Sequence, residues 1–234
     1  EAKEEEKPKT IAELTEGAER LDGLFTLFRD PKTGETSMLV RKDQLDKEFI
    51  YFIHIANGVV DAGFFRGAYG PSFIFTIERR FDKLEVVRQN TSFYFDPENA
   101  ISRAADANIS RAILAVEKIA AEDEASGDLL INADKLFLSE AFAQISPTPN
   151  PDADPKTDFK LGKLDKDKSQ ILNLRSYPLN TDVEVEYVFH NATPAVGGNE
   201  AVTDARNVSI RALHSLIEVP SNHYQPRMAD PRIG

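Results

Sequence analysis

Alternation of apolar and polar residues is the clearest pattern along this chain, and it predicts a succession of β-strands. In residues 181–190 nearly every second residue is apolar, the period of two expected of a strand with one buried face. Residues 49–55 are so rich in β-branched and aromatic side chains that they predict a buried strand. We expect further strands at residues 171–177 and 206–219.

Two β-hairpins are predicted in the first half of the chain. The first joins residues 24–28 to residues 36–40 through a turn that contains proline and glycine where a turn favours them. The second joins residues 72–79 to residues 83–88 across Phe81 and Asp82.

Helical patterns are few and short. Residues 10–18 predict a short helix, with Thr10 as its N-cap and Glu13 three residues later as the partner in a capping box. Residues 134–145 predict a second helix, with Asp134 as its N-cap. We therefore expect an α+β fold that is β-rich, with mostly antiparallel sheets and one or two short helices.

The remaining segments are less regular. Residues 90–95 and 129–131 predict short strands, whereas residues 109–121 fit a helical stripe and a strand alternation equally well. Residues 146–168 contain four of the 13 prolines and few apolar residues, which predicts a long surface loop or hinge.

The domain organisation follows from these segments. Residues 1–22 carry many charges and few bulky apolar side chains, which is typical of a flexible acidic tether. Residues 23–234 form the β-rich domain, in which the loop at residues 146–168 would join two lobes. The chain begins with Glu and ends on Ile233-Gly234 without a charged tail, so we expect it to be a piece of a longer protein.

Composition narrows the possible functions. The chain has 39 acidic and 28 basic residues, a net charge of −11, and this charge disfavours binding to nucleic acids or anionic membranes. An apolar content of 41% with 15 Phe and 6 Tyr is enough for a packed core. No apolar run is long enough to span a membrane. Without cysteine there is no disulfide and no thiolate metal site.

Motifs for catalysis or metal binding are weak. None of the four histidines belongs to an H-E-x-x-H zinc motif. His54 lies in an apolar strand, where we expect a core or structural histidine with hydrogen-bonded ring nitrogens. Asp152, Asp154 and Asp158 lack the glycine and glutamate of a calcium loop. The sequence therefore predicts no catalytic residue and no metal ligand in this chain.

A glycine-rich turn is the most distinctive local feature. Its glycines predict tight turns or a close backbone approach; they are Gly58, Gly63, Gly67 and Gly70. Five charged residues lie in or near this turn: Asp61, Arg66, Glu78, Arg79 and Arg80. The simplest interpretation is an ion-pair network that closes the turn, and the functional alternative is a polar recognition surface beside the turn's aromatic residues.

The order of several segments resembles a known family. Gly-Leu-Phe-Thr-Leu-Phe at residues 23–28, His-Ile-Ala-Asn-Gly at 54–58 and Phe-Thr-Ile-Glu-Arg-Arg at 75–80 are followed by Tyr-Gln-Pro-Arg-Met-Ala-Asp-Pro-Arg-Ile-Gly at 224–234. This arrangement is similar to the N-terminal module of bacterial zinc-dependent metalloproteases, in which domains of unknown function precede a metzincin-like catalytic domain. The resemblance covers residues 23–234.

The resemblance implies a non-catalytic accessory domain of a secreted, periplasmic or outer-membrane-anchored zinc peptidase. In that family the zinc ligands belong to a helix in the downstream catalytic domain, so this segment would hold no cofactor. Its partners would be that domain and a protein or peptide substrate. We expect eight residues to form the interface: Asp61, Phe64, Phe65, Arg66, Tyr69, Tyr224, Arg227 and Arg232.

Two other functions remain open from the sequence. Exposed aromatic residues beside polar ones are also typical of an independent cell-envelope β-domain that binds glycan or peptide. A complete enzyme would require groups such as His54, Asp61 and Glu78 to converge in space, and no spacing in the sequence favours that convergence.

Overall fold

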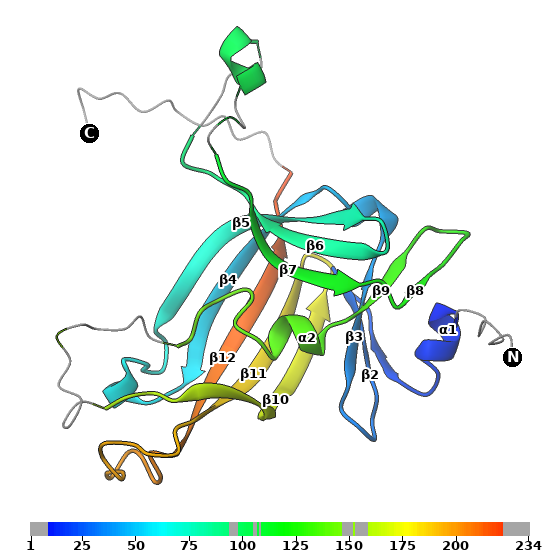
Figure 1. The fold of residues 1–234 in the computed structure, drawn as a ribbon. Helices are drawn as coiled ribbons and strands as arrows, with labels where there is room; N and C mark the ends of the chain where they lie inside the picture. Colours follow the sequence, from blue (N-terminus) through cyan, green and yellow to red (C-terminus); the bar gives the residue numbers. More distant parts are fainter. Residues whose placement is uncertain are drawn as a thin grey trace, which may run out of the picture.

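The computed structural model describes residues 9–93, 98–104, 107, 109–146, 152 and 159–221. These residues form two antiparallel β-sheets, accompanied by two short α-helices (Figure 1). The prediction of a β-rich antiparallel fold is confirmed. Helix content is small, so the α+β description holds only coarsely.

The larger sheet has seven strands, all paired antiparallel. Strands from both sides of segment 146–168 share this sheet. In spatial order the strands are β10 (Lys163–Tyr177), β11 (Asn180–His190), β12 (Asn207–Glu218), β4 (Glu48–Asn57), β5 (Tyr69–Arg80), β6 (Lys83–Arg88) and β7 (Ala112–Lys118).

The smaller sheet has five strands and covers part of the larger one (Figure 1). Its strands in spatial order are β1 (Glu19–Leu21), β2 (Thr26–Arg29), β3 (Thr36–Val40), β9 (Leu129–Asn132) and β8 (Ala121–Glu122). The helix α1 (Ile11–Leu14) and β1 both lie in the segment that we expected to be a tether. Three short 3-10 helices complete the described elements: η1 (Lys42–Gln44), η2 (Val60–Ala62) and η3 (Ala100–Ala104).

Both predicted helices exist, and both are much shorter than expected: α1 covers Ile11–Leu14 of the predicted residues 10–18. Thr10 and Glu13 form the capping box of α1. The second helix, α2 (Asp134–Phe137), has only one turn and its N-cap is Ala133. Beyond the C-cap of α2, backbone amides bond to side chains in place of helical carbonyls. The Ala141 amide donates to the Ser139 hydroxyl, and the amides of residues 145 and 146 donate to the Glu140 carboxylate.

Three further expectations about local structure are now settled in part. Residues 90–93 are not a strand, because the side chain of Asn90 accepts a bond from the Ser92 amide and turns the chain; residues 94 and 95 lie outside the described part. The predicted loop at 146–168 is too long, since β10 already begins at Lys163 and pairs with β11. In the ambiguous segment 109–121 the strand interpretation is correct: Ala112–Lys118 form β7, which pairs with β6, and Ala121 begins β8.

A single large core unites both sheets and the segment around α2. Phe25 from beside β2 packs on Phe49 of β4, and Phe142 from the segment after α2 stacks on Tyr51 of β4 at 4.9 Å. Figure 1 shows α2 in front of the larger sheet, between its edge strands β7 and β10. This placement allows α2 and the residues that follow it to line a space between the two edges. No helix in the described part of the chain has the length and hydropathy needed to span a membrane.

Candidate functional site

The glycine-rich turn between β4 and β5 is built as the sequence suggests. Gly63 and Gly67 have φ of 80° and 87°, a region that favours glycine. A Cβ on Gly58 would lie 2.8 Å from the Phe64 Cβ, so close packing also requires this glycine. The turn thereby places Phe64 half-buried against the core and leaves Phe65 exposed.

An aromatic surface, made of Phe52, His54 and Tyr69, lies next to this turn on the outer face of the larger sheet. The rings of Phe52 and Tyr69 are 5.7 Å apart, those of Phe52 and His54 are 6.1 Å apart, and Tyr69 is 81% exposed. The expectation that His54 belongs to the core is wrong. Its position alternates with those of the inward residues Tyr51, Ile53 and Ile55, so its side chain is half-buried on the opposite face.

The charged residues near the turn do not form one network. Asp61 accepts a hydrogen bond from Asn199 at 3.1 Å, whereas Arg79 forms an ion pair with Glu122 at 2.7 Å. Glu78 pairs with Arg80 at 2.9 Å and with Arg111 at 2.7 Å. These are separate groups because β5 is extended and carries its charged end away from the turn.

His54, Asp61 and Glu78 do not converge either. His54 pairs with Tyr69 across the two strands, and Glu78 is nine positions farther along β5, roughly 30 Å away for an extended strand. The arrangement required for a complete enzyme at these residues is therefore absent.

A fully buried polar cluster joins the larger sheet to α2. The Tyr51 and Tyr187 hydroxyl groups each lie 2.8 Å from one ring nitrogen of His214, and the Tyr187 hydroxyl donates to the Phe137 carbonyl at 2.7 Å. Tyr187 therefore accepts from Nε2–H of His214, and Tyr51 donates to its unprotonated Nδ1. Burial lowers the pKa of His214 to about 3, so the ring is neutral.

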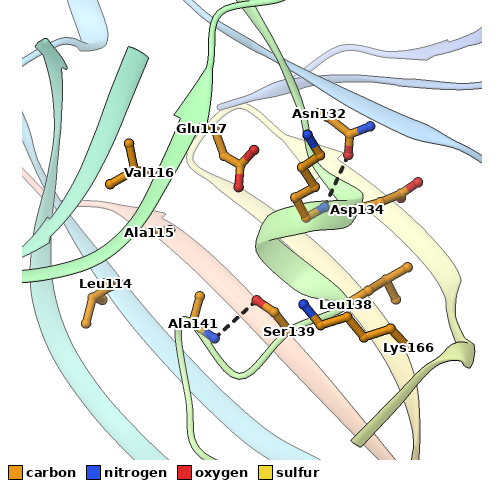
Figure 2. Close-up of a pocket in the computed structure, with 11 residues that line it drawn as sticks. Leu114, Ala115, Val116, Glu117, Asn132, Asp134, Leu138, Ser139, Ala141 and Lys166 are labelled. Atoms are coloured by element: carbon orange, nitrogen blue, oxygen red, sulfur yellow. Dashed lines mark hydrogen bonds between the residues drawn. The ribbon is translucent and has the colours of Figure 1, made fainter.

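A cavity of about 620 Å³ opens between β7, α2 and β10, and we call it the Glu117 cavity (Figure 2). It combines a polar and an apolar wall. Its lining residues are Leu114, Ala115, Val116, Glu117, Asn132, Asp134, Lys135, Leu138, Ser139, Ala141 and Lys166.

Glu117 is the buried charged group of this cavity. It lies opposite Leu84 of β6, on the inward face of β7, and only 8% of its surface is exposed. Figure 2 shows its carboxylate pointing from β7 toward α2. Burial raises the pKa of Glu117, and the charges of Lys135 and Lys166 partly oppose that rise.

Several other polar side chains of the cavity already bond to neighbouring atoms. Asp134 accepts from the Thr36 backbone amide at 3.2 Å, and burial raises its pKa. Asn132 accepts from the Lys135 amide at 3.1 Å and donates to Glu35. Ser139 donates to the Leu136 carbonyl and accepts from the Ala141 amide.

The sequence matches the family described as "Domain of unknown function (DUF5117)" over residues 67–234, well over half of the chain. The chain belongs to the DUF5117 family. No curated protein and no solved structure matches this sequence.

The region matched to DUF5117 is not a complete structural unit. It contains β5, β6, β7 and β10 to β12, together with the Glu117 cavity and His214. The strand β4 precedes it, yet β4 lies between β12 and β5 in the larger sheet. The DUF5117 region therefore depends on the preceding residues of this chain for a central strand.

Of the eight predicted interface residues of this DUF5117 protein, four are exposed at the turn: Asp61, Phe65, Arg66 and Tyr69. Phe64 is half-buried against the core. Tyr224, Arg227 and Arg232 lie outside the described residues.

Two sites were missed by the sequence predictions. His214 follows the inward positions Ile210 and Ala212 at a period of two, and this phase could have indicated a buried histidine. Glu117 shares an inward phase with Ala115, a signal that was hidden because residues 109–121 also fit a helix. No sequence pattern indicates that Lys166 lines the same cavity as Glu117, because Lys166 belongs to the opposite edge strand of the larger sheet.

A resident metal site is not apparent in the part of the chain that the structure describes. No group of three or more histidine, aspartate or glutamate side chains there is arranged to hold a metal ion. The His214 cluster brings together two tyrosines and a histidine, and the Glu117 cavity brings together two carboxylates and two lysines.

Proposed function

We propose that this chain is a non-catalytic accessory domain of a secreted, periplasmic or outer-membrane-anchored zinc-dependent metalloprotease, and that it contacts a catalytic domain that follows residue 234. The order of segments from residues 23–28 to residues 224–234 supports this proposal through its resemblance to such proteases. Zinc would be held by the catalytic domain. The role of this chain would be to position that domain or its protein substrate.

The observation that carries the proposed contact is the aromatic surface with the adjoining turn. Tyr69 is 81% exposed and Phe65 is 57% exposed, whereas many other aromatic rings of this domain are buried in its core. Large exposed rings beside charged groups such as Asp61 and Arg66 are enriched where proteins bind one another. The glycines at positive φ allow the tight turn that presents these side chains on the surface.

The first test is the native protein. We expect its reading frame to continue beyond residue 234 into an H-E-x-x-H helix, and the purified protein to contain about one zinc per chain. A native chain that ends near residue 234 and carries no metal would disprove the proposed function.

The second test addresses the contact itself. The downstream domain, produced separately, should bind this chain, and Phe65→Ala with Tyr69→Ala should weaken that binding at least about ten-fold, as expected for central aromatic contacts. Phe81→Ala is the matched control, since Phe81 is 93% exposed at the opposite end of β5. Equal loss in the control variant would contradict the assignment of the aromatic surface.

A second candidate function is an independent cell-envelope domain that binds glycan or peptide. The ring of Tyr69, which is exposed next to His54 and the charged turn, favours it, because sugars stack on such rings. Thermal stabilisation of this chain by a glycan, abolished by Tyr69→Ala, would support this candidate.

A further inference from the structure

The Glu117 carboxylate has an unusual environment for a buried charge. Within the described residues it forms no hydrogen bond and no ion pair, although 92% of the residue is removed from solvent. No buried side-chain oxygen or nitrogen of the described residues lacks a hydrogen-bond partner, so the Glu117 oxygens are accessible from the cavity. A carboxylate on a largely buried residue loses part of its hydration, and water, an ion or a ligand in the cavity would complete its bonding. Its open side is the cavity, toward which Figure 2 shows the carboxylate pointing.

Two positive charges line the same cavity as Glu117. Lys135 projects from α2 and Lys166 from β10, both are exposed, and neither makes an ion pair with a described residue. Both lie close enough to influence the pKa of Glu117 but do not contact it. Asp134 is the remaining charged group of the lining, and its carboxylate is occupied by the Thr36 amide.

An apolar wall lies between these charges. Leu114, Leu138 and Ala141 line the cavity together with the aliphatic part of the lysine side chains. Leu114 reaches this wall because β7 has a bulge between the pairs Val86–Ala115 and Val87–Ile113. A volume of about 620 Å³ is typical of pockets for small ligands.

We propose that the Glu117 cavity binds a small zwitterion with an apolar body, an amino acid or dipeptide with free termini. Its ammonium group would pair with the Glu117 carboxylate, its apolar side chains would contact Leu114 and Leu138, and its carboxylate would lie between Lys135 and Lys166. This site is independent of the aromatic surface, which lies on the outer face of the sheet.

The test uses three probes that differ only at their ends: leucyl-leucine, N-acetyl-leucyl-leucine and leucyl-leucinamide. We expect leucyl-leucine to bind with a dissociation constant below about 1 mM by calorimetry. The acetylated probe should bind at least about ten-fold more weakly, because it has no ammonium for Glu117. The amide should lose less affinity, since the exposed lysines act in a wetter environment.

A pair of variants ties the binding to this cavity. Glu117→Gln should weaken the binding of leucyl-leucine at least about ten-fold. The variant should also bind leucyl-leucine and its acetylated form with equal affinity. Glu124→Gln is the matched control: it removes the same charge from an exposed position outside the cavity lining, and it should leave all three affinities unchanged.

Three results would overturn the proposal. The first is that leucyl-leucine does not bind at 1 mM, a concentration roughly equal to the weakest affinity expected. The second is equal affinity for leucyl-leucine and its acetylated form. The third is unchanged binding of leucyl-leucine to the Glu117→Gln protein. If the Glu117→Gln protein does not fold, chemical-shift changes of the Leu114 and Leu138 methyl groups in the unmodified protein decide the same question. Shifts caused by leucyl-leucine and not by its acetylated form support the site, and shifts elsewhere on the protein exclude it.

Discussion

His214 and Glu117 are both ionisable residues on the inward face of the larger sheet, and both are largely buried, but their hydrogen bonding differs. Both ring nitrogens of His214 have tyrosine partners at 2.8 Å, whereas Glu117 has no described partner. Desolvation favours the neutral form of each, so it lowers one pKa and raises the other. The difference lies in their hydrogen-bond partners. His214 is bonded at both ring nitrogens and stabilises the fold, whereas Glu117 faces a cavity and can bind a ligand there.

Among variants that test this comparison, we expect the largest loss in the free energy of unfolding from a substitution at Tyr187. Tyr187→Phe removes the acceptor for His214 and the donor for the Phe137 carbonyl, and so leaves two buried groups unpaired. Tyr51→Phe leaves only Nδ1 of His214 without its donor. We expect losses in the free energy of unfolding of about 3 kcal/mol and about 1.5 kcal/mol respectively, measured by urea denaturation. Equal losses would show that the bond to Phe137 does not hold the α2 segment in place.

The next largest effect is the pH dependence that His214 confers. Its pKa is about 3 in the folded protein and near 6.5 when unfolded, so below pH 6.5 the unfolded state binds the extra proton. The stability from this group is therefore present above pH 6.5 and is lost progressively as the pH falls toward 3. From pH 7 to pH 5 the loss is about 2 kcal/mol.

His214→Gln provides the comparison for this pH effect, because glutamine does not titrate. The wild type should lose about 2 kcal/mol more than the variant between pH 7 and pH 5. Ring chemical shifts of His214 give an independent check in the folded wild type. A ring that titrates near pH 6 would contradict its assignment as a sealed structural group.

Patterns along the chain predicted the strands better than the sites, and the reason is physical. A period of two reports burial directly, so residues 49–55 and 181–190 could be assigned to β4 and β11. The same reasoning failed for residues 134–145, where backbone amides beyond the C-cap of α2 donate to the side chains of Ser139 and Glu140 in place of helical carbonyls. It also placed His54 in the core, because an apolar neighbourhood in sequence does not tell which face a residue takes.

The Glu117 cavity could not be predicted because it is assembled from distant segments. Glu117 and Lys166 belong to the two opposite edge strands of the larger sheet, and in the folded chain they line one space together with residues of α2. The turn at residues 58–70 was predictable since a local glycine pattern specifies it. Its charged residues were not, because their partners Asn199 and Glu122 lie far away in sequence.

A smaller effect on stability is expected at Glu117, the second group of the comparison. Glu117→Gln replaces a partly desolvated carboxylate, which has no described partner, with a neutral side chain of the same shape. It should raise the free energy of unfolding at pH 7 by about 1 kcal/mol in the absence of ligand. The folded pKa of Glu117 is raised, which means that its cost appears as the pH rises and disappears in acid. The variant and the wild type should therefore converge near pH 4. A variant less stable than the wild type at pH 7 would reveal a favourable partner for Glu117.

The smallest stability effect is expected at the aromatic surface, where neither burial nor hydrogen bonding constrains the ring. Tyr69→Ala should change the free energy of unfolding by less than about 0.5 kcal/mol, because Tyr69 is 81% exposed and its described ring contact is with Phe52. Phe73→Ala, on the buried side of the same strand, should cost about 3 kcal/mol and shows what a structural ring contributes. A loss above about 1 kcal/mol in Tyr69→Ala would mean that Tyr69 supports the fold, and its exposure would then no longer indicate a contact surface.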